Sequence, residues 1–117
     1  MVSIIQRGML VLAFAMFSWA CLPGDRSVHV SFVNDSTAPL AVFPYGRNYP
    51  DSQFTLAPAE RVTKNLLAGE AQPDSPVAHV EALSTDRALV FCHDYTYGEL
   101  QKLDRTVRLR PGVLDCR

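Results

Sequence analysis

The chain has 117 residues, which is enough for one domain, and its 48% hydrophobic and 20% charged residues are typical of a globular protein. Its formal net charge of −1 argues against a nucleic-acid partner, which would need a basic surface. The same balance provides no polybasic attraction toward anionic lipids.

The first twenty residues have the form of a secretory signal. Arg7 precedes an apolar run over residues 8–19, and the small residue Ala20 ends that run. A charged start, a short apolar middle and a small-residue exit are the parts of an export signal. The run is also shorter than the ~20 apolar residues of a membrane-spanning helix. We therefore expect residues 1–20 to be a removable signal peptide.

Two cleavage patterns fit the end of this leader. Ser18 and Ala20 are small residues at the third and first positions before a general signal-peptidase cut, which would release a soluble secreted protein. The cysteine after Ala20 resembles the lipobox of bacterial lipoproteins, in which that thiol carries a diacylglycerol. This resemblance implies that Cys21 is a lipid attachment site, and two acyl chains hold a protein stably on a membrane.

The three cysteines favour one disulfide. Thiols of exported proteins tend to pair, and a lipid on Cys21 would leave Cys92 and Cys116 for each other. Their bond would close a loop of about 25 residues and contribute about 3–3.5 kcal/mol. The alternative is a nucleophilic Cys92 with His93 as its base, but adjacent residues on a strand point to opposite faces.

A tether and one β-rich domain follow the leader. The stretch over residues 21–26 contains Pro and Gly and predicts the tether, and the domain is expected over residues 27–117. Short runs with apolar residues, separated by turn residues, indicate strands in this domain. They predict strands over residues 27–34, 40–45, 53–56, 61–67, 77–83, 88–93 and 105–110.

Local patterns refine this prediction. Val28, Val30 and Phe32 share one face of the first run, and this run with the next predicts a hairpin over residues 27–45. The sequence Thr96-x-x-Glu99 has the form of a capping box and predicts a short helix over residues 97–103.

The run over residues 88–93 is nearly all apolar, so it is the best candidate for a central strand. Residues 113–116 are expected to fold back toward Cys92. The predicted fold is all-β, a small β-sandwich or open barrel of about six or seven short strands with one short helix.

The tyrosines form the first candidate site. Exposed tyrosines beside an arginine have the composition of a recognition surface, because Tyr offers a large area and a hydroxyl at low entropic cost. The candidate binding surface consists of Tyr45, Arg47, Tyr49, Tyr95 and Tyr97.

The histidines give a second hypothesis, a small metal-binding protein or enzyme that uses His79, His93 and Asp94. Their spacing matches no known ligand pattern, so we predict neither a cofactor, a metal nor a catalytic residue. Asn34-Asp35-Ser36 has the form of a glycosylation site, but we interpret it as a turn, because Asn and Asp bond readily to the turn backbone.

The outline resembles small bacterial lipoproteins of unassigned function, through the leader with Cys21, the run VSFVNDSTAPLAVF and the terminal cysteine pair. The resemblance implies a cell-envelope location, anchored in a membrane and facing the periplasm or the exterior. We expect a membrane-tethered module that binds an envelope protein or a small molecule and is not an enzyme. The alternative is a soluble secreted protein cleaved after Ala20.

Overall fold

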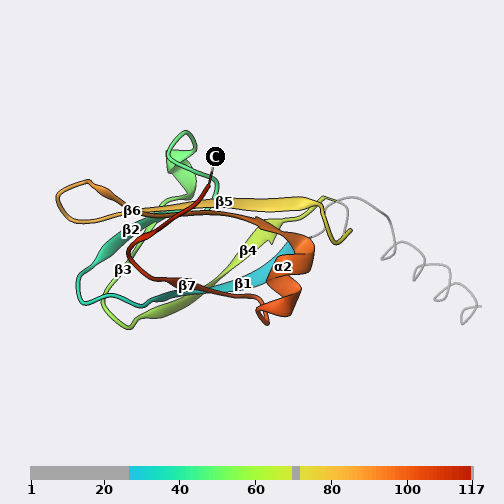
Figure 1. Cartoon of the computed structure of the whole chain (residues 1–117), viewed down its shortest axis with the longest axis horizontal. Helices are drawn as coiled ribbons and strands as arrows, with labels where there is room; N and C mark the ends of the chain where they lie inside the picture. The colour runs from blue at the N-terminus through green and yellow to red at the C-terminus, as the bar shows by residue number, and fades with distance from the viewer. Residues whose placement is uncertain (1–26, 70–71, 117) are drawn as a thin grey trace, which may run out of the picture.

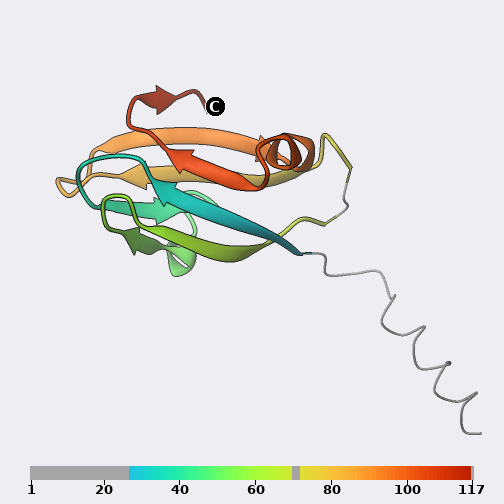
Figure 2. The same ribbon diagram turned by 90° about the horizontal axis from the view of Figure 1, so that it is seen from below.

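The strand pairings divide the chain into two layers. In the computed structural model, which describes residues 27–69 and 72–116, one sheet has the order β4-β1-β7 and the other the order β3-β2-β5-β6-β8. Figures 1 and 2 show the two sheets stacked on each other. The strands are β1 (Ser27–Asn34), β2 (Leu40–Phe43), β3 (Phe54–Leu56), β4 (Arg61–Leu67), β5 (Pro76–Leu83), β6 (Leu89–Thr96), β7 (Thr106–Leu109) and β8 (Val113–Leu114). The predicted all-β fold is confirmed, and of the two predicted architectures the two sheets fit the sandwich and not the open barrel.

The hydrophobic core lies between the sheets and takes alternate side chains from the strands that face it. Val28, Val30 and Phe32 of β1 are buried on one face, as the alternation predicted. Val80 of β5 and Phe91 of β6 belong to the same buried cluster from the other sheet. Burial of each such side chain contributes about 1.5–3 kcal/mol, so this face holds the layers together.

The predicted hairpin over residues 27–45 is wrong, because β1 and β2 belong to different sheets. β1 pairs antiparallel with β4 and parallel with β7, whereas β2 pairs with β3 and β5. Alternation in a sequence shows which face of a strand is buried but not which strand lies beside it. The turn after β1 therefore carries the chain from one layer to the other.

The side chain of Asn34 stabilises the turn that carries the chain from one sheet to the other. Its side chain is almost fully buried, and Nδ2 donates to the carbonyl oxygens of Ala38 at 2.9 Å and Leu56 at 3.0 Å. Its Oδ1 accepts from the backbone N–H of Ser36 at 2.9 Å and from the Ser36 hydroxyl at 2.6 Å. The turn interpretation is confirmed. Because Nδ2 is buried and bonded, it is not presented for glycosylation.

The helical elements are short. α2 (Tyr97–Lys102) starts at Thr96, whose hydroxyl accepts the backbone N–H of Glu99 at 3.1 Å, as the capping pattern predicted. A 3-10 turn, η1 (Pro50–Ser52), is the other helical element among the described residues. Within the described ranges, no helix has the length and apolar character that crossing a membrane requires. The predicted signal peptide, tether and Cys21 lie outside these ranges.

The C-terminus adds a strand that the sequence patterns missed. After β7, the chain returns to the larger sheet, and β8 pairs parallel with β6 through Phe91↔Val113 and Cys92↔Leu114. Two residues are too few to show a period. This pairing gives β6 a neighbour on each side, although β5 is the middle strand of the sheet.

Replacing Asn34 by Ala should lower the free energy of unfolding by about 2 kcal/mol, because two carbonyl oxygens lose their buried donor. Urea denaturation followed by circular dichroism measures this change. Asn48, which is exposed in a loop, is the matched control. Asn48→Ala should change the stability by less than about 0.5 kcal/mol, and equal losses in the two variants would contradict the role given to Asn34.

Candidate functional site

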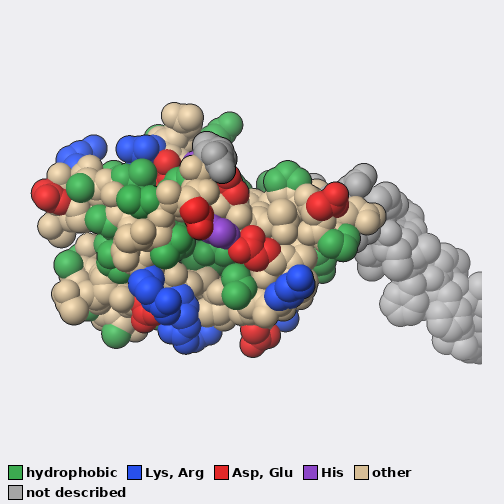
Figure 3. All heavy atoms as spheres, in the orientation of Figure 1, with side chains coloured by type: hydrophobic (Ala, Val, Ile, Leu, Met, Phe, Trp, Pro, Cys, Tyr) green, Lys and Arg blue, Asp and Glu red, His purple; other side chains and the backbone are tan. Residues whose placement is uncertain are grey.

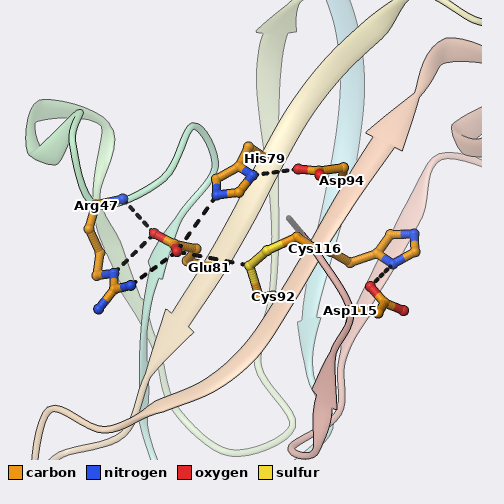
Figure 4. The surroundings of a disulfide bond; sticks show 8 residues. Arg47, His79, Glu81, Cys92, Asp94, Asp115 and Cys116 are labelled. Atoms are coloured by element: carbon orange, nitrogen blue, oxygen red, sulfur yellow. Dashed lines mark hydrogen bonds and ion pairs between the residues drawn. A yellow bond between two sulfur atoms is a disulfide. The ribbon is translucent and has the colours of Figure 1, made fainter.

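The predicted disulfide joins Cys92 of β6 to Cys116. Their Cα atoms are 5.4 Å apart, within the range of natural disulfides. The backbone N–H of Asp115 donates to the carbonyl oxygen of Cys92 at 2.9 Å, so the segment after β8 is held beside β6. The bond lies on the outer face of the larger sheet, among the polar side chains drawn in Figure 4.

Around the bond lies a group that we call the disulfide cluster. It consists of Arg47, His79, Glu81, Cys92, Asp94 and Cys116. The register of β5 on β6 creates it, because His79 lies opposite Asp94 and Glu81 lies opposite Cys92. Opposite residues of an antiparallel pair have Cβ atoms about 4.5–5.5 Å apart, so their side chains meet.

Glu81 is the buried charge of this cluster, with only 10% of its side chain exposed. Arg47 satisfies it through the backbone N–H at 2.7 Å, Nε at 3.1 Å and Nη2 at 3.3 Å. Burial raises the pKa of Glu81, but the hydrogen bonds and charge of Arg47, with a contribution from His79, outweigh burial and lower it below 4.5. Glu81 is therefore a carboxylate at neutral pH.

A glycine allows the loop after β2 to reach this carboxylate. Gly46 has φ +91°, and a Cβ at this position would lie 2.8 Å from Cδ2 of His79. Only glycine adopts this backbone without strain and leaves that space free. The close approach brings the backbone N–H of Arg47 to Glu81.

The three residues of the histidine hypothesis lie on two faces of the sheet, with His79 and Asp94 on the outer face and His93 on the inner face. Nδ1 of His79 bonds to Asp94, and Nε2 lies 3.6 Å from Oε2 of Glu81. His93 does not join them, because its neighbour Cys92 takes the outer face and the pleat turns His93 the other way. The structure therefore brings together His79 and Asp94, with two cysteines that the hypothesis did not include.

His93 lies between two carboxylates. Its Nδ1 is 2.6 Å from Oδ1 of Asp115, and its Nε2 is 2.6 Å from Oε2 of Glu99. Burial lowers the pKa of His93, but the hydrogen bonds and charges of Glu99 and Asp115 outweigh it and raise the pKa above 6.5. Glu99 thus has two roles: its backbone N–H donates to the helix cap at Thr96, and its side chain bonds to His93.

The cleft around His93 opens between the two sheets. It has a volume of about 620 Å³, and Arg108 and Arg110 of the β7 segment lie on its rim. Both arginines lie near Asp35, at 3.7 Å and 3.5 Å. In Figure 3, a histidine lies between acidic side chains on this face, with basic side chains nearby. His93, Arg108 and Arg110 at this cleft are therefore already paired with carboxylates.

The five residues of the candidate binding surface take different positions. Tyr49 is 63% exposed, whereas Tyr95 is buried and Tyr97 packs against the core. Arg47 is engaged by Glu81. The hydroxyl of Tyr45 accepts the backbone N–H of Leu67 at 3.1 Å, which ties the loop to the end of β4.

Tyr45, Tyr49 and Tyr95 line one groove of about 610 Å³, which we call the tyrosine groove. Leu67, 65% exposed, and the residues at the start of β5, Pro76 and Val77, complete its apolar wall. Sequence reasoning missed these three. The only local signal was Leu67 beside Leu66, since adjacent residues of a strand point to opposite faces and cannot both face the core.

Comparison with known proteins gave no match among protein-family models, curated proteins or solved structures. The function of this chain is therefore inferred from its own sequence and geometry.

Replacing Cys116 by Ser should lower the free energy of unfolding by about 3.5 kcal/mol, because the unfolded chain regains the freedom of the loop closed by the disulfide. Denaturation with and without a thiol reductant measures the loss. The reductant should destabilise the wild type by a similar amount and leave Cys116→Ser unchanged. A wild type insensitive to reductant would contradict this role.

His93 should make stability depend on pH. Its pKa is raised on folding, so its stabilising contribution is complete below pH 6.5 and is lost as the pH rises through the folded-state pKa. The denaturation midpoint should therefore fall as the pH rises above 6.5, and His93→Gln should flatten this fall. A variant with the wild-type slope would show that other groups cause it.

Proposed function

We propose that this protein is a membrane-tethered β-sandwich whose tyrosine groove binds the surface of the lipid bilayer that anchors it. The observation that carries the proposal is the position of the groove. Leu67, in its wall, pairs with Ser27, the first residue of the domain. The apolar groove and the first residue of the domain, to which the predicted tether joins, therefore lie side by side.

The length of the tether supports this placement. Six residue steps separate Cys21 from Ser27, and an extended chain spans at most ~3.6 Å per residue. A lipid on Cys21 would hold Ser27 within about 22 Å of the bilayer surface. The adjacent groove is then kept near the headgroups without any binding energy of its own.

The chemistry of the groove suits that location. Most of its lining is aromatic or aliphatic, and Tyr49 and Leu67 present their side chains to solvent. Tyrosine is enriched at membrane interfaces because its ring is apolar and its hydroxyl remains hydrated. The lipid anchor would hold the domain at the bilayer, and the weak contribution of the groove would then fix its orientation.

Tyr49→Trp provides a direct test, because the single tryptophan of the sequence, Trp19, lies in the predicted signal peptide. In protein reconstituted into vesicles with brominated acyl chains, the fluorescence of this variant should be strongly quenched. Thr85→Trp, in the loop at the other end of β5, is the matched control and should be quenched much less.

Intact-mass measurement on the same preparation separates the two parts of the proposal. A mature chain that starts at Cys21 with a diacylglyceryl group supports the tether, whereas an unmodified chain cleaved after Ala20 contradicts it and favours the secreted alternative. If the lipid is present but both variants are quenched equally, the tether stands and the role of the groove is wrong.

A further inference from the structure

The disulfide cluster gathers zinc ligands around one point. One ligand atom each of His79, Cys92 and Cys116 lies within 4.8 Å of the other two. Thiolate sulfur and imidazole nitrogen are the preferred donors for Zn²⁺, at about 2.3 Å and 2.0–2.1 Å. Small side-chain rotations would bring the three atoms onto one ion, provided that the sulfurs are not bonded to each other.

The imidazole of His79 is already oriented for this task. Its Nδ1 faces the carboxylate of Asp94, and its Nε2 faces the side of Glu81 (Figure 4). A zinc-binding histidine usually donates its second N–H to a carboxylate, which fixes the tautomer and the ring direction. Asp94 supplies that carboxylate and leaves Nε2 as the ligand nitrogen.

Glu81 offers the fourth ligand. Its Oε2 lies 3.6 Å from Nε2 of His79 and 3.9 Å from Sγ of Cys92. Arg47 holds the other oxygen, Oε1, through Nε at 3.1 Å and the backbone N–H at 2.7 Å. Its Nη2 also donates to Oε2 at 3.3 Å, and this longer bond is the one that Zn²⁺ would replace. Two thiolates, one carboxylate, Zn²⁺ and the guanidinium of Arg47 together carry no net charge, which reduces the cost of enclosing them.

The ligands would remain together after reduction, because the backbone holds the C-terminal segment independently of the disulfide. The N–H of Gly112 donates to Val90 at 2.8 Å, and the N–H of Asp115 donates to Cys92 at 2.9 Å. The side chain of Asp115 also bonds to His93. Cys116 therefore stays beside β6 when its sulfur is free.

We infer that reduction of the Cys92–Cys116 bond converts the disulfide cluster into a Zn²⁺ site formed by His79, Cys92, Cys116 and Glu81. A dithiol reductant supplies two electrons and two protons, so the protein gains two thiols and the reductant becomes a cyclic disulfide. Zn²⁺ then replaces the two thiol protons, which pass to solvent. Either cross-link fastens the C-terminus to β6. The inference of this site does not rest on the proposed membrane function.

The test is a titration with Co²⁺ and Zn²⁺ of the full-length expressed protein, purified in detergent and reduced with a dithiol that is removed before metal is added. The reduced protein should bind one Co²⁺ with a thiolate-to-cobalt absorption band, and Zn²⁺ should displace it. The oxidised protein should show no band. A reduced protein without the band, or an oxidised protein that binds equally, overturns the inference.

Variants distinguish this site from adventitious binding. His79→Ala should weaken Zn²⁺ binding at least tenfold in competition with a chromophoric chelator, and Asp94→Asn by about tenfold. His29→Ala, an exposed histidine on the other sheet, is the matched control and should bind within twofold of the wild type. Circular dichroism of the oxidised variants checks folding, and Asp94→Asn decides the matter if His79→Ala does not fold. Undiminished binding by the folded variants overturns the assignment.

Discussion

The register of β5 on β6 is the constraint on which the candidate sites depend. It places His79 opposite Asp94 and Glu81 opposite Cys92 on the outer face. The same register puts Val80 and Phe91 into the core, so a slip of one residue would expose the core side and bury the polar side. Hydrophobic packing between the sheets therefore determines which polar groups meet outside them.

The pleat of β6 explains why one short run of residues serves two environments. Cys92 and Asp94 point outward to the disulfide cluster, whereas His93 lines the cleft between the sheets. The C-terminal segment contributes to both, because Asp115 bonds to His93 and Cys116 bonds to Cys92. The groove and the cluster also share His79 and Asp94 at their boundary.

The sequence allowed the local elements to be predicted but not their partners. Alternation identified β1 and β7, and the Thr96 cap identified the start of α2, because these signals lie within a few residues of each other. The β1–β7 pairing and the contact of Arg47 with Glu81 join residues far apart in the chain. The periodicity of a segment does not predict such long-range contacts.

The site residues show the same difference between local signals and long-range contacts. The Cys92–Cys116 bond was predictable by counting thiols, whereas the groove wall at Leu67 and Pro76 was not. These residues show no binding pattern in the sequence, and they form a wall only because the end of β4 lies close to the start of β5.

The parallel pairing of β1 with β7 joins two strands from opposite ends of the domain. Ser31 pairs with Thr106, so one edge of the first strand of the domain finds its partner only near the other end of the chain. Long-range and parallel pairings form slowly, since the loop between them must close before they contribute. A chain that emerges N-terminus first can form the β5–β6 hairpin early, but it cannot complete the smaller sheet until almost all of it is free. One edge of β1 stays unpaired during that interval, which is when the domain is most exposed to aggregation and proteolysis.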